Sequence, residues 1–319
     1  MHDLFTDSVN APSGRLAEIL LKKLTKAEGG REMPDDMRPR FDKLVRAEGA
    51  FGELARVRLA AAVWFLFERA PKWTAENIVP LFDWSSPDAH AAWSSLKYPN
   101  YIGSPKLIGL MKEPFLALFG RDDIDEDDLQ NFAEWLAAIM LAKQAGNADY
   151  PITPTEARSA LRQAGVKGLS SVGHRLAVEM EKAKPKEKIA RWRNIVGPVF
   201  QNIWPLDAEL QTSSSTFKLV QILRCSGAAF PEVADVIIPF IRPEDPRRHT
   251  SVHSISEAAD ILYSSSPEKM LDLISAVVGD APARSVYDLT KALDRVRAHD
   301  SKLADTKRFQ KLVSIAGAT

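Results

Sequence analysis

Cysteine is nearly absent from this sequence, since Cys225 is the only one among 319 residues. A disulfide framework within the chain is therefore excluded, which is typical of proteins in a reducing compartment. Cys225 ends the apolar stretch of residues 219–225, so we expect a small buried side chain there. An apolar setting raises the pKa of a thiol, which argues against a nucleophilic role for Cys225.

Long hydrophobic runs are missing as well. The longest, residues 59–67, is about half of the ~20 apolar residues that a membrane-spanning helix needs. Residues 1–13 lack a basic start followed by an apolar block, so no signal peptide is expected. We predict a cytoplasmic protein that does not associate with membranes.

The sequence has no excess of charge of one sign, because 42 Lys and Arg residues balance 42 Asp and Glu residues. The net charge therefore produces no overall electrostatic field that would attract the whole chain to nucleic acid. The balance conceals a separation along the chain, since residues 113–149 are mainly acidic and residues 158–193 mainly basic. Either block is a candidate binding surface, or the two blocks face each other.

Motifs of the common enzyme classes do not occur. The sequence contains no GxGxxG, no Walker A loop, no HExxH and no GxSxG. We therefore expect no catalytic residues and no cofactor, and we predict that the protein is not an enzyme.

The acidic segment 122–134 has part of the pattern of a calcium-binding EF-hand loop. Oxygen ligands recur from Asp123 to Glu134 at suitable spacing, but Asp128 stands where the loop needs glycine. Carboxylates that complement the dipole at a helix N-terminus explain the segment more simply. Whether the segment binds an ion stays open at this point.

His249 and His253 are four positions apart, which would place both imidazoles on one helix face. Arg247 and Arg248 adjoin them, however, and no cysteine or third histidine lies nearby in the sequence. We therefore predict no metal site.

Apolar residues recur at helical spacing along most of the chain. One segment follows steps of three and four through Ile189, Trp192, Ile195, Val196, Val199, Phe200 and Ile203. A hydroxyl residue followed by proline marks helix starts at Ser86, Ser104, Thr153 and Ser266. Period-two alternation is scarce, so little or no sheet is expected.

The pattern indicates about fourteen helices joined by short loops, at roughly 40 residues per helix pair. It predicts an all-α fold, an irregular α-solenoid of stacked helical hairpins similar to HEAT arrays. We expect one half over residues 1–150 and a second over residues 151–319, continuous with the first. A compact pair of helical domains divided near residue 150 is the alternative. The best internal similarity in the sequence is between residues 78–82 and 237–241, which are both apolar and centred on proline.

Three stretches carry a resemblance to a known group of proteins. They are AAWSSLKYP at 91–99 with LIGLMKEPFL at 107–116, ARWRNIVGPVFQNIWP at 190–205, and SSSPEKMLDLISAVV at 264–278 with the helices of 289–312. Together they resemble the helical C-terminal regions of large bacterial antiphage defence proteins, including those fused to sirtuin-like domains. The resemblance implies a sensing or scaffolding module whose effector chemistry lies elsewhere, although this chain lacks a nucleotide-handling domain.

The leading hypothesis is a non-catalytic helical-repeat module that binds a protein, either an effector subunit or a phage component. The alternative is a nucleic-acid-binding helical array that uses a basic face around residues 158–193. The candidate residues for contact with a protein or nucleic-acid partner are Lys182, Lys184, Lys186, Lys188, Arg191, Arg193, Arg247 and Arg248. Trp84, near a loop, is a candidate anchor for a protein partner.

Overall fold

The computed structural model describes residues 4–27, 32–96, 103–146, 149–245, 250–282 and 286–317. Within these ranges every regular element is helical and no strand occurs, so the all-α prediction is confirmed. None of the helices in this part of the chain has both the length and the apolarity required to cross a bilayer. The chain divides into two compact units, Met1–Trp135 with Ala148–Ile152 and Leu136–Asn147 with Thr153–Thr319.

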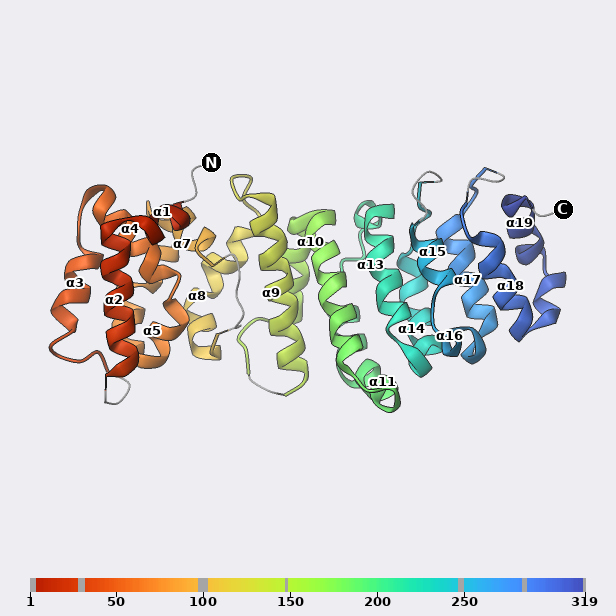
Figure 1. Ribbon diagram of the computed structural model, residues 1–319, viewed down its shortest axis with the longest axis horizontal. Coiled ribbons are helices and arrows are strands. Elements are labelled where there is room, and N and C mark those ends of the chain that lie inside the picture. Colours follow the sequence, from red (N-terminus) through yellow and green to blue (C-terminus); the bar gives the residue numbers. More distant parts are fainter. Residues whose placement is uncertain are drawn as a thin grey trace. The chain divides into compact units, whose positions relative to one another are not determined.

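The first unit consists of helices α1 to α8 and the start of α9 (Figure 1), which pack around an aromatic core. Its helices are α1 (Leu4–Asn10), α2 (Pro12–Lys26), α3 (Arg38–Val45), α4 (Gly49–Ala60), α5 (Val63–Arg69), α6 (Pro71–Asn77), the 3-10 turn η1 (Val79–Phe82), α7 (Ala89–Ser94), α8 (Pro105–Leu118) and the first part of α9 (Glu126–Gln144). The buried ring of Trp93 lies 5.9 Å from Phe115 and 5.5 Å from Phe132, between ring centroids. Its indole N–H donates to the carbonyl of Phe82 at 2.9 Å, so the polar edge of this side chain is also satisfied.

The second unit continues with helices that follow one another in chain order (Figure 1). Its elements after α9 are α10 (Pro154–Lys182), η2 (Pro185–Glu187), α11 (Lys188–Arg191), a π-helical turn η3 (Trp192–Val196), α12 (Gly197–Ile203), η4 (Ala208–Leu210), α13 (Ser213–Arg224), η5 (Gly227–Ala229), α14 (Phe230–Ile237), η6 (Ile238–Phe240), α15 (Thr250–Ser256), α16 (Asp260–Ser265), α17 (Pro267–Val278), α18 (Leu289–His299), η7 (Ser301–Asp305) and α19 (Lys307–Ala316). The described part of the chain thus holds more helices than the periodicity predicts, and they range from α11 with 4 residues to α10 with 29.

The predicted helix starts are confirmed at three of four positions. Thr153 forms a complete capping box, in which its hydroxyl accepts from the Glu156 N–H at 3.2 Å and Glu156 accepts from the Thr153 N–H at 2.8 Å. Ser104 caps α8, and α17 begins directly after Ser266. The start predicted at Ser86 is wrong. The Ser86 hydroxyl accepts from the N–H two residues on, which forms a local turn, and α7 begins only at Ala89.

Residues 189–203, predicted as one regular helix, contain a π-helical turn. The N–H of Gly197 donates to the carbonyl of Trp192, five residues back, between α11 and α12. Pro198 follows directly and has no N–H to donate, so the wider turn lies where a regular helix would lose a hydrogen bond anyway. Trp192 is buried, as its periodicity predicts.

The two similar apolar segments, residues 78–82 and 237–241, also have a similar local structure. Residues 238–240 form a 3-10 turn directly after the short helix α14, and residues 79–82 form one after the short helix α6, with one residue between. In both turns proline occupies an early position, where its missing N–H would have no helical partner.

Candidate interaction surfaces and a histidine–carboxylate cluster

Four of the six predicted basic contact residues that the structure describes have partners within the chain. Arg193 binds Glu232 through two hydrogen bonds of 2.8 and 2.6 Å. These bonds raise the pKa of Arg193 and lower that of Glu232. Arg191 pairs with Glu179 at 2.9 Å, and Lys182 lies 3.6 Å from the same carboxylate.

Lys188 has a local structural role. Its ammonium donates to the carbonyl of Met180 at 2.6 Å, in the last turn of α10, where a cation also complements the helix dipole. Lys184 and Lys186 are exposed on the turn that follows, and no ion pair forms there among the described residues. Arg247 and Arg248 lie outside the described residues. The basic block is therefore neutralised in part by its own chain, which leaves fewer charges for phosphate groups.

The acidic segment around residues 122–134 is helical from Glu126 onward. The helix α9 begins at Glu126, so the second half of the EF-hand-like spacing lies along a helix that cannot wrap around an ion. Asp123, which precedes the helix, accepts two hydrogen bonds from Arg121 and lies 2.9 Å from His90. These contacts lower the pKa of Asp123, chiefly through the hydrogen bond from Arg121.

Trp84 is half-buried, and both the N–H edge and the face of its indole ring contact other residues of the chain. Its indole N–H donates to the carbonyl of Pro114 at 2.8 Å. The guanidinium of Arg121 lies over the indole, 4.1 Å from the ring centroid. Trp84 thus joins elements within its own unit.

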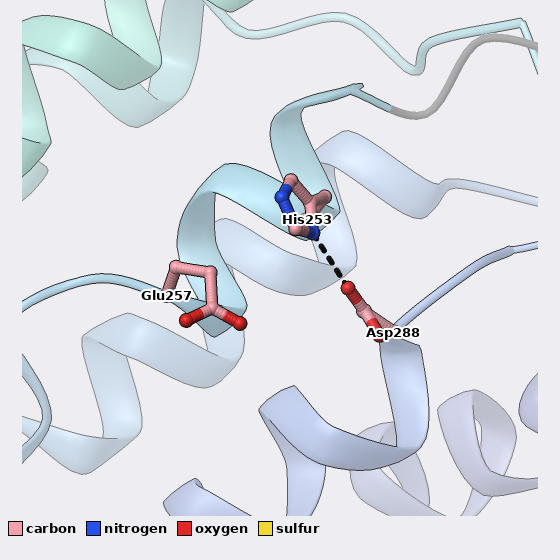
Figure 2. Close-up of side chains that lie close together, drawn as sticks. All are labelled: His253, Glu257 and Asp288. Carbon is pink, nitrogen blue, oxygen red and sulfur yellow. Dashed lines mark hydrogen bonds and ion pairs between the residues drawn. The ribbon is translucent and has the colours of Figure 1, made fainter.

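Three metal-ligating side chains gather at the start of α18. His253, Glu257 and Asp288 place ligand atoms within 4.8 Å of one another. Figure 2 shows His253 and Glu257 on successive turns of one helical segment, with Asp288 at the start of the helix that faces it. The Glu257 N–H donates to the carbonyl of His253, four residues back, so the helical turn extends just past α15 and puts both side chains on one face.

Asp288 is held in an uncommon backbone conformation. Its φ of 59° lies in the left-handed region, which aspartate tolerates better than most residues. Asp288 occupies the N-cap position of α18, yet its carboxylate makes no capping bond to that helix. It lies instead 2.6 Å from Nδ1 of His253. The carboxylate is thus directed across to the neighbouring helical segment.

Lys291 is the cation that adjoins the cluster. It forms an ion pair with Glu257, and this hydrogen bond is the largest cause of the lowered pKa of Glu257. The charge of Asp288 acts on that pKa in the opposite direction, because the two carboxylates repel each other. Asp288 and Lys291 also line an open groove along α18, so the cluster is accessible to solvent.

The sequence pattern revealed only one member of this cluster. It paired His253 with His249, which lies outside the described residues. Glu257 could have been found, since it follows His253 by four positions on a helical pattern. Asp288 comes from 35 positions further along the chain, and only the packing of α18 against α15 brings it close.

Comparisons with known proteins do not assign the chain to a family. No family model matches the chain, and no solved structure matches it. An uncharacterized protein, y4cA of Sinorhizobium fredii, is 23% identical over 317 residues, which cover 97% of this chain. The chain spans 26% of the length of that relative.

Proposed function

We propose that this chain is a stacked array of helical hairpins that binds another protein and contributes no catalysis. The observation that carries the proposal is a recurring register in the polar contacts between helices. Within each unit, several of these contacts join residues whose separation in the sequence is close to the length of one helical hairpin.

In the first unit four such contacts span 31 to 34 residues, while Arg69 reaches further back, to the carbonyls of Leu24 and Ala27 across 45 and 42 positions. Trp73 donates to Asp42 across 31 positions at 2.7 Å. Arg56 donates to Asp88 across 32 positions at 2.8 Å. The further contacts are His90 with Asp123 across 33 positions and Ser94 with Asp128 across 34.

The second unit repeats the spacing with ion pairs. Lys269 pairs with Asp235 across 34 positions, and Lys311 with Asp280 across 31. Arg295 reaches Asp260 across 35 positions at 3.3 Å. Because helical arrays of the HEAT type repeat at roughly 40 residues, contacts at this spacing are those expected between successive hairpins. A chain in which each hairpin contacts its neighbours in this way offers long faces for protein binding.

The outer face of α2 is the surface that best suits a protein partner. Leu16 and Ile19 lie three positions apart on that face and are 47% and 50% exposed. The same helix carries Arg15, Lys22, Lys23 and Lys26 against one acidic residue, Glu18. Lys22 pairs with Glu18 at 2.8 Å, and exposed apolar side chains on a helix with an excess of cations favour a partner segment that combines apolar and acidic side chains.

The setting that we propose is bacterial defence against phages, as a sensor or scaffold. The support is the resemblance of residues 91–116, 190–205 and 264–312 to the helical regions of such proteins. That the matching region is 26% of the y4cA protein fits a module that works beside further protein segments. Loss of the gene should then raise phage plating efficiency in a susceptible host. Unchanged plating across a broad phage panel would contradict this setting.

The nucleic-acid alternative has less support, because Arg191, Arg193 and Lys182 are paired with carboxylates. It predicts binding that falls steeply with salt and is lost when Lys184 and Lys186 become glutamate. We expect instead that the wild-type chain and the K184E/K186E variant both leave single-stranded and duplex DNA unshifted at low salt.

Binding through α2 is tested by affinity capture of the full chain from its native host, followed by titration of the purified partner. The double variant Leu16→Asp with Ile19→Asp should weaken binding at least ~10-fold, which corresponds to ~1.4 kcal/mol. The matched control is Leu206→Asp, because Leu206 is 62% exposed and belongs to the other unit. Equal affinity of the two variants would refute binding through α2. Failure to retain any specific protein would refute the module itself.

A further inference from the structure

We propose that His253, Glu257 and Asp288 form a binding site for a divalent transition-metal ion, with Zn²⁺ the ion that they fit best. This inference does not depend on the proposed protein-binding function, and its test has a separate readout.

The donor set determines the class of metal. One imidazole nitrogen and two carboxylate oxygens lie within 4.8 Å of one another. Zn²⁺ accepts this mixture of nitrogen and oxygen, whereas Ca²⁺ and Mg²⁺ prefer oxygen alone. Three protein ligands leave a fourth tetrahedral position for water or for a side chain of a partner.

The side chains can reach tetrahedral geometry with small movements. Ligand atoms around Zn²⁺ lie about 3.3 Å apart, given metal–ligand distances of about 2.0 to 2.1 Å. Nδ1 of His253 and the Asp288 oxygen are now 2.6 Å apart and share a proton, so the ion would take the place of that proton. If the imidazole is neutral, its one proton moves from Nδ1 to Nε2 when the ion binds Nδ1. If it is doubly protonated, the Nδ1 proton is released to solvent and the Nε2 proton stays. The side chain of His253 is 58% exposed and can turn freely, while that of Asp288, 18% exposed, is the more fixed ligand.

A second histidine–aspartate pair in the same unit shows what distinguishes this cluster. His299 lies 3.0 Å from Asp260, but Asp260 also binds the guanidinium of Arg295 at 3.3 Å. A bound guanidinium neutralises the carboxylate and repels a second cation. At Asp288 the third group is the carboxylate of Glu257, which adds negative charge.

The pair in the first unit follows the neutralised pattern. His90 lies 2.9 Å from Asp123, whose oxygens accept two hydrogen bonds from Arg121. Among the described residues, only the cluster of His253 brings a second carboxylate to a histidine–aspartate pair.

Lys291 competes with the metal ion for Glu257. Their ion pair joins side chains that are 52% and 49% exposed, so water can replace the contact when Glu257 turns to the ion. Removal of this ammonium should therefore tighten metal binding, an effect that a purely structural role of the cluster would not produce.

The test is titration of the full, metal-free chain with Zn²⁺ by isothermal calorimetry, with Co²⁺ absorption as a probe of coordination. We expect one site per chain and Co²⁺ d–d bands of a four-coordinate site. His253→Ala should weaken Zn²⁺ binding at least ~10-fold, and Lys291→Gln should strengthen it by about 3-fold or more. The matched control, His299→Ala, removes a histidine with one aspartate and one arginine and should leave the affinity unchanged.

Three outcomes would overturn the site. One is the absence of Zn²⁺ binding by the wild-type chain. Another is an equal loss in the His253 and His299 variants, which would indicate scattered surface binding. The third is weaker binding after Lys291→Gln. None of these outcomes bears on the capture experiment with α2, so the two proposals can fail independently.

Discussion

The guanidinium of Arg295 lies over the ring of Tyr263, with its carbon 4.0 Å from the ring centroid. The buried hydroxyl of Tyr263 donates to the carbonyl of Ile255 at 3.0 Å. Burial raises the pKa of Tyr263 to about 12, and the nearby guanidinium acts in the opposite direction. The phenol therefore remains protonated in the folded protein at a pH where an exposed tyrosine ionises.

This raised pKa predicts a loss of stability at alkaline pH. Below the unfolded pKa of about 10 the phenol is neutral in both states, and above it only the unfolded chain releases the proton. The folded state therefore loses stability as the pH rises from about 10 to 12. The loss in the free energy of unfolding reaches about 2 kcal/mol at the upper end. Tyrosine absorbance should show a phase that ionises well above pH 10, and Tyr263→Phe should reduce that late phase by the amplitude of one tyrosine. A wild-type titration in which every tyrosine ionises near pH 10 would contradict this assignment.

The capping box at Thr153 predicts a measurable loss of stability on mutation. Thr153→Ala leaves the Glu156 N–H without its acceptor and should cost about 1 kcal/mol in the free energy of unfolding. The control is Thr25→Ala, because the Thr25 hydroxyl only donates to the carbonyl of Leu21 within its own exposed helix. Urea denaturation should show little or no loss in the control. Equal losses in both variants would argue against the cap.

Substitution by alanine should lower the free energy of unfolding more at Gly103 than at Gly165. Both have positive φ, 74° and 65°, and Gly165 has a ψ of −163° in a region that is essentially restricted to glycine, so alanine strains either backbone by about 1–3 kcal/mol. At Gly103 a Cβ would also lie 2.6 Å from the ring of Trp64, whereas at Gly165 it would meet no atom within 4 Å. Gly103→Ala should therefore cost a further ~1–3 kcal/mol, measured by hydrogen exchange in the unit that carries each change. Similar costs at both positions would mean that Trp64 yields without penalty.

The buried carboxylate of Glu244 predicts a large effect from a small change. Glu244 is 7% exposed and accepts hydrogen bonds from both the N–H and the hydroxyl of Ser251, at the start of α15. Glu244→Ala leaves both donors unsatisfied and should cost about 1–3 kcal/mol. The exposed Glu268, in the first turn of α17, provides the control, and its alanine variant should stay within ~0.5 kcal/mol of wild type. Thermal unfolding of the two variants side by side distinguishes these outcomes.

Local chemistry made several features of the fold predictable. Thr153 followed by proline and Glu156 identifies a helix start without any tertiary contact, because the bonds involved join residues three positions apart. The spacing of Trp192 predicts its burial. Cys225 was expected to be buried but is only half-buried, although burial is still the largest cause of its raised pKa. The Ser86 start failed because the same hydroxyl can also close a turn. Sequence pattern alone does not choose between these two uses of one side chain.

Periodicity, caps and turn residues are short-range properties, and they were enough to predict an all-helical chain before any contact between helices was known. The partners of the charged residues were not predictable in this way. Asp288 faces His253, and Glu232 neutralises Arg193, only because helices more than 30 positions apart pack side by side. A carboxylate is acidic in any context, but whether it caps a helix, pairs with a cation or turns toward a histidine depends on its neighbours in space. The basic block therefore looked like an open binding face in the linear sequence, while the packed helices pair much of it internally and assemble a histidine–carboxylate cluster elsewhere.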